Sequence, residues 1–272
     1  FFAPFPGEPV IMTSQTGIYY PGEEINTIGN WNYRDGYQIK ASESFTLEME
    51  GFDQIDTEVN LDSGWNLIPV LTGCGAGTEE LFGALPAVNV VKEVAGTGVY
   101  WPEYGISTLT TLTPGRSYWI SVNADASFIY PECTEQLPKA PVSKTDFRTS
   151  PWNEVQSTAI SHIFALPADV LQQAEIIAGD LIGIFGTDDQ YYGLIEVDQT
   201  DNNRVMVAFA DDETTTAKDG LTGNEPVSFR LYRPSSGKEG LLEADYDTGM
   251  PQQGNFKKNG VSALSGLRMT SL

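Results

Sequence analysis

Histidine is almost absent from this chain, which contains one, His162, among its 272 residues. Charge-relay triads and most zinc sites need histidine, and the sequence has no nucleophile elbow of the Gly-x-Ser-x-Gly type. His162 lies in the alternating segment 159–164, so we expect it on a β-strand, facing solvent or a packed edge. The composition leaves one catalytic alternative open, a pair of carboxylates of the glycosidase type, because acidic residues are abundant. We predict no catalytic residue and no enzymatic activity.

Basic residues are scarce too, because 15 Lys and Arg stand against 37 Asp and Glu, a formal net charge of −22. Such a surface repels phosphate backbones, which argues against nucleic-acid binding. No apolar run has the length of a membrane helix, so we expect no membrane insertion. The first ten residues lack a basic residue and do not resemble a signal peptide, and the chain has no initial Met. We therefore expect a mature or excised part of a longer protein.

Only two cysteines are present, Cys74 and Cys133. They are either two buried thiols or a disulfide, and we favour the disulfide in an oxidising exterior. A crosslink closing a loop of this length stabilises a protein by about 4 kcal/mol in chain-entropy models.

In place of a catalytic motif the chain carries an internal repeat. Residues 17–40 align without a gap with residues 98–121, at a constant offset of 81 (98 minus 17). The shared positions are turn, strand and core types, which predicts two related small β-rich repeats with short helices. The matched pairs are Val10/Val91, Thr16/Thr97, Gly17/Gly98, Tyr19/Tyr100, Pro21/Pro102, Ile25/Ile106, Thr27/Thr108, Tyr37/Tyr118 and Ile39/Ile120.

The two copies differ in completeness. The second, at 53–133, opens with the strand-like segment 59–70, but the first, at 1–52, has no counterpart of its Ser-Gly-Trp-Asn-Leu-Ile-Pro-Val sequence. Either the missing strand lies upstream in a longer protein, which is the simpler arrangement, or another chain supplies it.

The pattern changes after a proline-containing linker at 134–153. Residues 154–272 carry short apolar or alternating runs separated by Gly, Asp, Asn and Pro, with one helix near 168–178. This spacing predicts a β-sandwich domain, so the whole chain is predicted to be mainly β.

Two sets of residues are candidate ligand sites. Exposed aromatic rings bind sugars or peptides by stacking, and the alternative role of such rings is core packing; the candidates are Tyr19, Tyr20, Tyr100, Trp101 and Tyr104. The acidic loop 210–220 offers hard oxygen ligands to Ca²⁺ from Asp211, Asp212 and Asp219. It lacks the spacing of an EF-hand, and a solvated acidic connection between strands is the alternative.

The second copy resembles modules that recur in secreted and surface-anchored proteins of the Bacteroidota, which commonly use the type IX secretion system. The match is carried by Gly-Trp-Asn-Leu-Ile at 64–68, by Val-Tyr-Trp-Pro-Glu-Tyr-Gly-Ile at 99–106, and by Leu-x-Pro-Gly-x-x-Tyr at 112–118. The first copy departs from it, since Tyr33-Arg34-Asp35-Gly36 replaces the usual Pro-Gly. Segments 179–197, 207–234 and 256–267 resemble a companion module of the same proteins.

This resemblance implies an extracellular or cell-surface location and defines no reaction. We therefore predict a non-catalytic structural or adhesive module array, which serves as a spacer, stalk or filament component of a larger cell-surface protein. Its partners would be other domains of the same polypeptide or neighbouring subunits. The alternative is a carbohydrate-binding module of a secreted multidomain protein, with surface glycans as its ligands.

Overall fold

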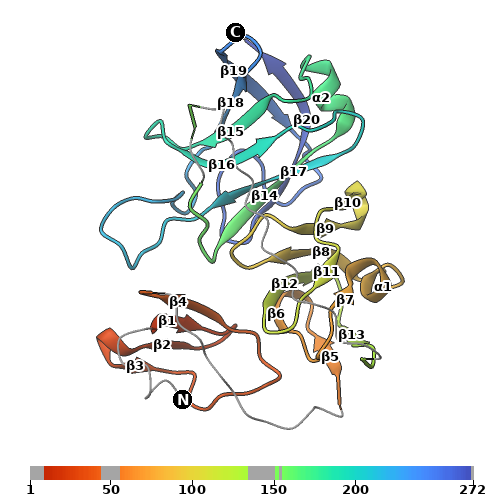
Figure 1. Ribbon diagram of the computed structural model, residues 1–272, viewed down its shortest axis with the longest axis vertical. Helices are drawn as coiled ribbons and strands as arrows, with labels where there is room; N and C mark the ends of the chain where they lie inside the picture. Colours follow the sequence, from red (N-terminus) through yellow and green to blue (C-terminus); the bar gives the residue numbers. More distant parts are fainter. Residues whose placement is uncertain (1–8, 44–55, 134–150, 153–154, 271–272) are drawn as a thin grey trace. The chain divides into compact units, whose positions relative to one another are not determined.

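The computed structural model describes residues 9–43, 56–133, 151–152 and 155–270 (Figure 1). These residues are mainly β, as predicted, with twenty strands and two short α-helices among them. They divide into two compact units, of which the first comprises the described residues of 9–94, 98–102 and 107–133. The predicted linker, at 134–153, lies almost wholly outside the described residues.

The first unit begins with a small antiparallel sheet in the order β3-β2-β1-β4. A 3-10 turn, η1 (Pro21–Glu23), joins two of its strands, and proline suits the first position of that turn because its missing N–H has no helical partner there. The strands are β1 (Pro9–Thr13), β2 (Ile18–Tyr20), β3 (Ile25–Asn26) and β4 (Gln38–Ala41).

A second antiparallel sheet follows, in the order β10-β9-β8-β12-β6, with the small pairs β11-β7 and β13-β5 beside it. The helix α1 (Thr78–Phe82) has two acids in its first turn, where negative charge is favoured. The strands are β5 (Glu58–Leu61), β6 (Gly64–Pro69), β7 (Ala76–Gly77), β8 (Val88–Glu93), β9 (Val99–Trp101), β10 (Ile106–Ser107), β11 (Thr111–Leu112), β12 (Ser117–Val122) and β13 (Ala126–Ile129), with η2 at Pro102–Tyr104.

The core of this second sheet follows from the alternation along its strands. On β12, Tyr118, Ile120 and Val122 are buried while the residues between them are half-buried. The buried set packs against α1, β5 and β13 through Leu81, Phe82 and other apolar side chains. Burying a side chain of this size contributes about 1.5–3 kcal/mol, so this face holds the sheet and its neighbours together.

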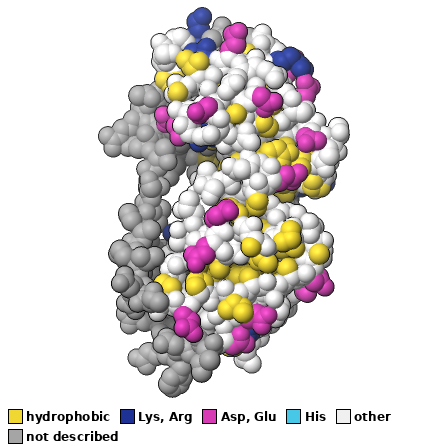
Figure 2. Space-filling view, turned by 90° about the vertical axis from the view of Figure 1, so that its right-hand side faces the viewer, with side chains coloured by type: hydrophobic (Ala, Val, Ile, Leu, Met, Phe, Trp, Pro, Cys, Tyr) yellow, Lys and Arg dark blue, Asp and Glu magenta, His cyan; other side chains and the backbone are white. Residues whose placement is uncertain are grey.

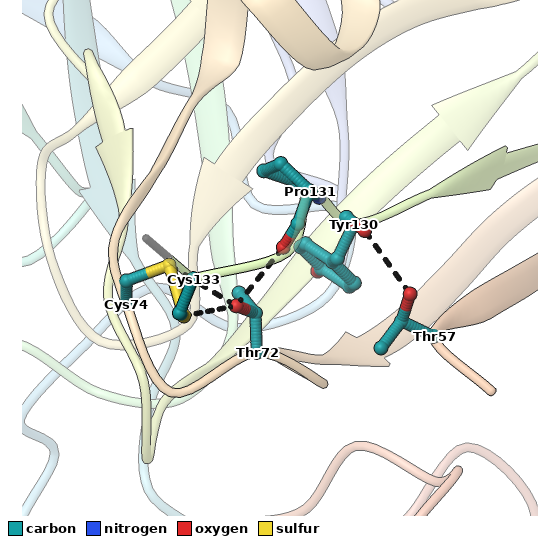
Figure 3. Close-up of a disulfide and its surroundings, with 6 residues drawn as sticks. All are labelled: Thr57, Thr72, Cys74, Tyr130, Pro131 and Cys133. Atoms are coloured by element: carbon teal, nitrogen blue, oxygen red, sulfur yellow. Dashed lines mark hydrogen bonds between the residues drawn. A yellow bond between two sulfur atoms is a disulfide. The ribbon is translucent and has the colours of Figure 1, made fainter. Parts of the chain in front are cut away.

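The predicted disulfide joins Cys74 to Cys133 (Figure 3). The hydroxyl of Thr72 lies beside both sulfurs and donates to the carbonyl of Pro131 at 3.3 Å. Nearby, the hydroxyl of Thr57 donates to the carbonyl of Tyr130 at 3.0 Å. The crosslink therefore ties the segment after β6 to the segment after β13.

The second unit contains one nearly closed, barrel-like sheet in the order β16-β15-β18-β19-β20-β14-β17. Its neighbouring strands pair antiparallel, except that β14 pairs with β20 in parallel. A single curved sheet thus stands where two packed sheets of a sandwich were expected. Its elements are β14 (Ser161–Leu166), α2 (Ala168–Gln173), β15 (Leu181–Phe185), β16 (Tyr191–Glu196), β17 (Arg204–Phe209), β18 (Ser228–Arg233), β19 (Lys238–Tyr246) and β20 (Val261–Met269).

Candidate functional site

The hydrogen bonds of the two N-terminal sheets explain why certain residues recur. The hydroxyl of Thr27 accepts from the N–H of Ile18 at 2.9 Å and donates to the same residue's carbonyl. Thr108 does the same with Val99, again at 2.9 Å from its N–H. A side chain that bonds to both the N–H and the carbonyl of one strand residue needs a donor and an acceptor close to its own backbone. The hydroxyl of threonine provides both.

A second recurring contact involves the matched tyrosines. The N–H of Asn32 donates to the hydroxyl of Tyr37 at 2.9 Å, and the N–H of Thr113 donates to the hydroxyl of Tyr118 at 2.9 Å. Each tyrosine lies five residues after its donor, so the ring spans the turn that precedes its own strand. These matched letters therefore mark identical local hydrogen bonds.

One predicted match, Val10 with Val91, is wrong. Val91 pairs with Tyr100 on the neighbouring strand, whereas Tyr19, the counterpart of Tyr100, pairs with Met12. The residue equivalent to Val91 is therefore Met12. The gapless alignment holds only after the hairpin turn, and the strand before that turn is shifted by two residues.

The shift arises because the first hairpin is shorter. Its turn closes with the N–H of Gly17 donating to the hydroxyl of Ser14 at 3.0 Å. In the second sheet the N–H of Gly98 donates to the carboxylate of Glu93 at 2.9 Å across a longer turn. Ser14 and Glu93 thus accept from the matched glycine of each turn, although their side chains differ in length. Because both turns keep this hydrogen bond, the two residues missing from the first turn are not evident from the sequence.

The strand orders place the missing element. In the second sheet β12 lies between β8 and β6, and in the first sheet the corresponding strand, β4, pairs with β1. Among the described residues β4 is the end strand of its sheet. The first sheet thus lacks, within the described chain, the counterpart of β6 that the sequence comparison predicted to be missing.

The outer edge of β6 is closed by residues of the first sheet's turns. The side-chain amide of Gln15 donates to the carbonyl of Trp65 at 3.0 Å and accepts from the N–H of Leu67 at 3.0 Å. The N–H of Gly36 donates to the carbonyl of Leu67 at 3.2 Å. These are the bonds that another β-strand would make, so the polar edge of β6 is satisfied without one.

Further contacts hold the same junction. The N–H of Tyr37 donates to the hydroxyl of Ser117 at 3.0 Å. The guanidinium of Arg34 donates to the carbonyl of Glu58 at 2.9 Å and pairs with the carboxylate of Asp56. Together with the bond from Gly36, these contacts link the turn 32–37 to three strands: β6, β12 and β5. We call this set of contacts, centred on Gln15 and Gly36, the junction.

The aromatic candidates do not form one platform. Successive residues on a strand point to opposite faces, so neither Tyr19 and Tyr20 nor Tyr100 and Trp101 present their rings on a common side. Tyr100 and Trp101 are 2% and 1% exposed, which leaves no ring face for a sugar. The two residues of β2 are half-buried, as is Tyr104 at the end of η2. For Tyr100 and Trp101, the alternative of core packing is correct.

The acidic loop is organised by its own backbone. Asp211 accepts from the N–H of Asp219 at 2.8 Å, and Asp219 accepts from the N–H of Asp212 at 2.8 Å. The carboxylate of Asp212 accepts from the N–H and hydroxyl of Thr214. Within the described ranges no group of three acidic, histidine or cysteine side chains is arranged to hold a metal ion. Calcium binding at this loop stays a prediction, and the carboxylates have structural partners.

His162 was expected to face solvent or a packed edge, but it is fully buried on β14, which lies between β20 and β17. Its Nδ1 accepts from the N–H of Lys257 at 3.1 Å, so its proton lies on Nε2 and is donated to Ser262 at 2.9 Å. The serine hydroxyl in turn donates to the carbonyl of Gln253 at 3.0 Å. A general base must accept the serine proton, so this histidine–serine pair has the tautomer opposite to that of a nucleophile pair.

A second polar cluster missed in the sequence surrounds Glu225, whose side chain is 5% exposed. Its carboxylate accepts from the N–H and hydroxyl of both Thr187 and Thr222 and from the ammonium of Lys218. Burial alone would raise its pKa, but the bonds from Lys218, Thr222 and Thr187 lower the pKa of Glu225 to about 2. Lys218 also pairs with Asp188 at 2.8 Å, so the cluster joins two loops, the one between β15 and β16 and the one between β17 and β18.

No family model, curated protein or solved structure matches this chain. Its described helices contain five and six residues, too short to cross a membrane. On the face in Figure 2, acidic side chains are scattered among apolar ones over the described surface.

Proposed function

We propose that this chain is a non-catalytic structural or adhesive module array on the cell exterior, acting as a spacer, stalk or filament component of a larger protein. In this proposal residues 9–43 and 56–133 belong to two copies of one module, and the barrel-like sheet is a companion module. The extracellular location follows from the sequence resemblance and agrees with the presence of a disulfide.

The junction carries the proposal. Gln15 and Gly36 bond to the backbone of β6 in the way of a neighbouring strand, so the first module closes the edge of the next. An open edge strand invites pairing with other chains, and arrays need such edges closed between successive modules.

The polar clusters support the same proposal. His162 has the wrong tautomer for a serine nucleophile, and Glu225 and Asp211 hold loops through hydrogen bonds from backbone N–H groups. Groups used in this way stabilise the fold. The carbohydrate-binding alternative is not favoured, because Tyr100 and Trp101 are buried.

Force spectroscopy on the full chain, pulled from its two ends, tests the proposal. We expect the unfolding force of the first unit to fall in the Gln15→Ala variant, because the junction bonds resist separation of the two sheets. The exposed Gln173, on α2, provides a matched control, and Gln173→Ala should leave that force unchanged. Equal forces in both variants, or retention of the unmodified chain on a glycan array, would argue against a spacer.

A further inference from the structure

We propose that the Cys74–Cys133 disulfide is a reversible thiol-exchange site, at which an external thiolate attacks Sγ of Cys133 and Cys74 is the leaving group. The substrate class is a neutral or cationic thiol. The inference goes beyond the proposed array function and does not depend on it, because it uses only the surroundings of the crosslink (Figure 3).

The two cysteines differ in exposure. Cys74 is 8% exposed, on the segment after β6, whereas Cys133, on the segment after β13, is an exposed residue. Thiol–disulfide exchange requires the attacking thiolate to reach a sulfur, so access selects the sulfur that is attacked. Attack at Cys133 is therefore favoured over attack at Cys74, and it leaves the electron pair of the broken bond on Cys74.

The hydroxyl of Thr72 offers a proton to the leaving sulfur. Its Oγ lies 3.2 Å from Sγ of Cys74, 2.8 Å from Sγ of Cys133 and 3.3 Å from the carbonyl oxygen of Pro131. Disulfide sulfurs carry no proton, so the hydroxyl is the donor in each contact, and a neutral sulfur is a weak acceptor. A thiolate is a stronger acceptor, so the bond from Thr72 strengthens as Cys74 leaves and favours that step.

The exchange step is balanced by the thiol itself. The external thiolate forms a new S–S bond to Cys133, the bond between Cys133 and Cys74 breaks, and its electron pair becomes the Cys74 thiolate. The external thiol is thus oxidised to a mixed disulfide while Cys74 is reduced. In the reverse step the Cys74 thiolate attacks Cys133 and expels the external thiol, which restores the crosslink.

Contacts other than the crosslink hold the same segments together, so exchange leaves the module folded. Tyr130 is 1% exposed, and its hydroxyl donates to the carbonyl of Pro69, at the end of β6, at 2.9 Å. The N–H of Tyr130 donates to the carbonyl of Thr57 at 3.2 Å, and β13 pairs with β5 along its whole length. Cys74 and Cys133 therefore stay close after exchange, which favours the reverse step.

Charge near the attacked sulfur selects among thiols. Glu132, next to Cys133, is exposed, and the chain has a formal net charge of −22. A negative surface repels an anionic thiol such as glutathione and attracts a cationic thiol such as cysteamine. Salt screens charges at exposed positions, so it should reduce the difference between these two thiols.

The first experiment maps the adduct on the unmodified, oxidised full chain. The chain is treated with cysteamine, the reaction is stopped in acidic denaturant, free thiols are labelled with N-ethylmaleimide, and the peptides are analysed by mass spectrometry. We expect cysteamine chiefly on Cys133 and the maleimide chiefly on Cys74. Equal adducts on the two cysteines, or a majority on Cys74, would overturn the proposal.

A second experiment compares exchange rates in variants of Thr72. Thr72→Val should slow exchange by about threefold or more, because the hydrogen bond to the charged leaving sulfur is lost. Thr72→Ser keeps the hydroxyl and should retain the rate of the unmodified chain. The exposed Thr110 provides a matched control in the same unit, and Thr110→Val should leave the rate unchanged. Equal rates in Thr72→Val and the unmodified chain would contradict the proposal.

Two measurements on the unmodified chain separate exchange in the folded module from exchange after unfolding. Rates with cysteamine and with glutathione, each divided by the thiolate concentration, should favour cysteamine at low salt and converge at high salt. The amide of Tyr130 should exchange with solvent as slowly in the adduct as in the crosslinked chain. Loss of this protection, or equal rates for the two thiols at low salt, would overturn the proposal.

Discussion

The side-chain amide of Gln15 bonds to Leu67 as a strand backbone would, accepting from its N–H at 3.0 Å while donating to the carbonyl of Trp65 at 3.0 Å. An amide side chain is the only neutral one that offers a donor and an acceptor in this planar arrangement. Its geometry therefore matches the spacing of two backbone groups on one edge of β6.

Replacing Gln15 should expose this edge. Each hydrogen bond contributes about 0.5–1.5 kcal/mol, so Gln15→Ala is expected to lower the stability of the junction by about 1–2 kcal/mol. Gln15→Glu should cost at least as much, because a carboxylate cannot donate to the carbonyl of Trp65. Hydrogen exchange of the Leu67 amide measures this directly, and exchange as slow as in the unmodified chain would contradict it.

Reducing the disulfide should lengthen the chain under force. Cys74 and Cys133 are 59 positions apart, so the intact bond withholds about 200 Å of extended chain from stretching. We expect the oxidised chain to lack this increment and the reduced chain to release it. The Cys74→Ser variant should release it under both conditions, and an unchanged contour length on reduction would contradict the role of the crosslink.

Acid should destabilise the second unit through Glu225. The pKa of this carboxyl is lowered from 4.5 to about 2, so its contribution is fully present above pH 4.5 and is lost as the pH falls towards 2. The contribution is roughly 3 kcal/mol. In Glu225→Gln, the denaturant midpoint of unfolding should no longer fall as the pH drops across this range. Glu213→Gln, at an exposed position, is the control, and its midpoint should still fall.

Lys92 should also make stability rise with pH, in the first unit and over a higher pH range. Burial lowers the pKa of its ammonium from 10.5 to about 7, so the unfolded chain binds more protons between these values. Stability is therefore expected to rise with pH from about 7 to 10.5. Lys92→Met should flatten this rise in melts recorded across that pH range. A rise in melting temperature between about pH 7 and 10.5 that Lys92→Met retains in full would contradict the expectation.

Calcium should leave the melting temperature unchanged. The carboxylates of Asp211 and Asp219 accept backbone N–H groups of their own loop, and a cation would have to displace these bonds. Differential scanning calorimetry with chelator and with millimolar Ca²⁺ makes the comparison. A rise in melting temperature with Ca²⁺ that Asp212→Asn abolishes would restore the loop as a calcium site.

Local hydrogen bonds explain what could be predicted from the sequence. Thr27 and Thr108 recur because their hydroxyls bond to the same strand position, so a matched letter corresponds to a matched contact. Both cysteines lie within the second copy, and with two cysteines in the chain one intramolecular pairing is possible. By contrast, the apolar run that contains Val10 and Met12 fits either register, and turn length decided between them.

Other features depend on packing that sequence patterns do not encode. The alternation around His162 is typical of a half-exposed strand, yet β14 is buried along its whole length inside the barrel-like sheet. Adjacent tyrosine and tryptophan residues suggested a platform, but strand geometry separates Tyr100 from Trp101. Gln15 carries no sequence signal, because its role is defined by a strand some fifty residues away.

The junction also gives the molecule a direction. Gln15 and Gly36 lie on turns of one sheet, while their acceptors and donor lie on an edge strand of the next, so the two contacting surfaces differ. Contacts between unlike surfaces join copies head to tail, as a ring or as an open chain, whereas a surface that binds its own copy ends at a dimer. In the proposed array, an open chain of modules joined in this way would have distinguishable ends, so that growth or anchoring at one end would be chemically distinct from that at the other.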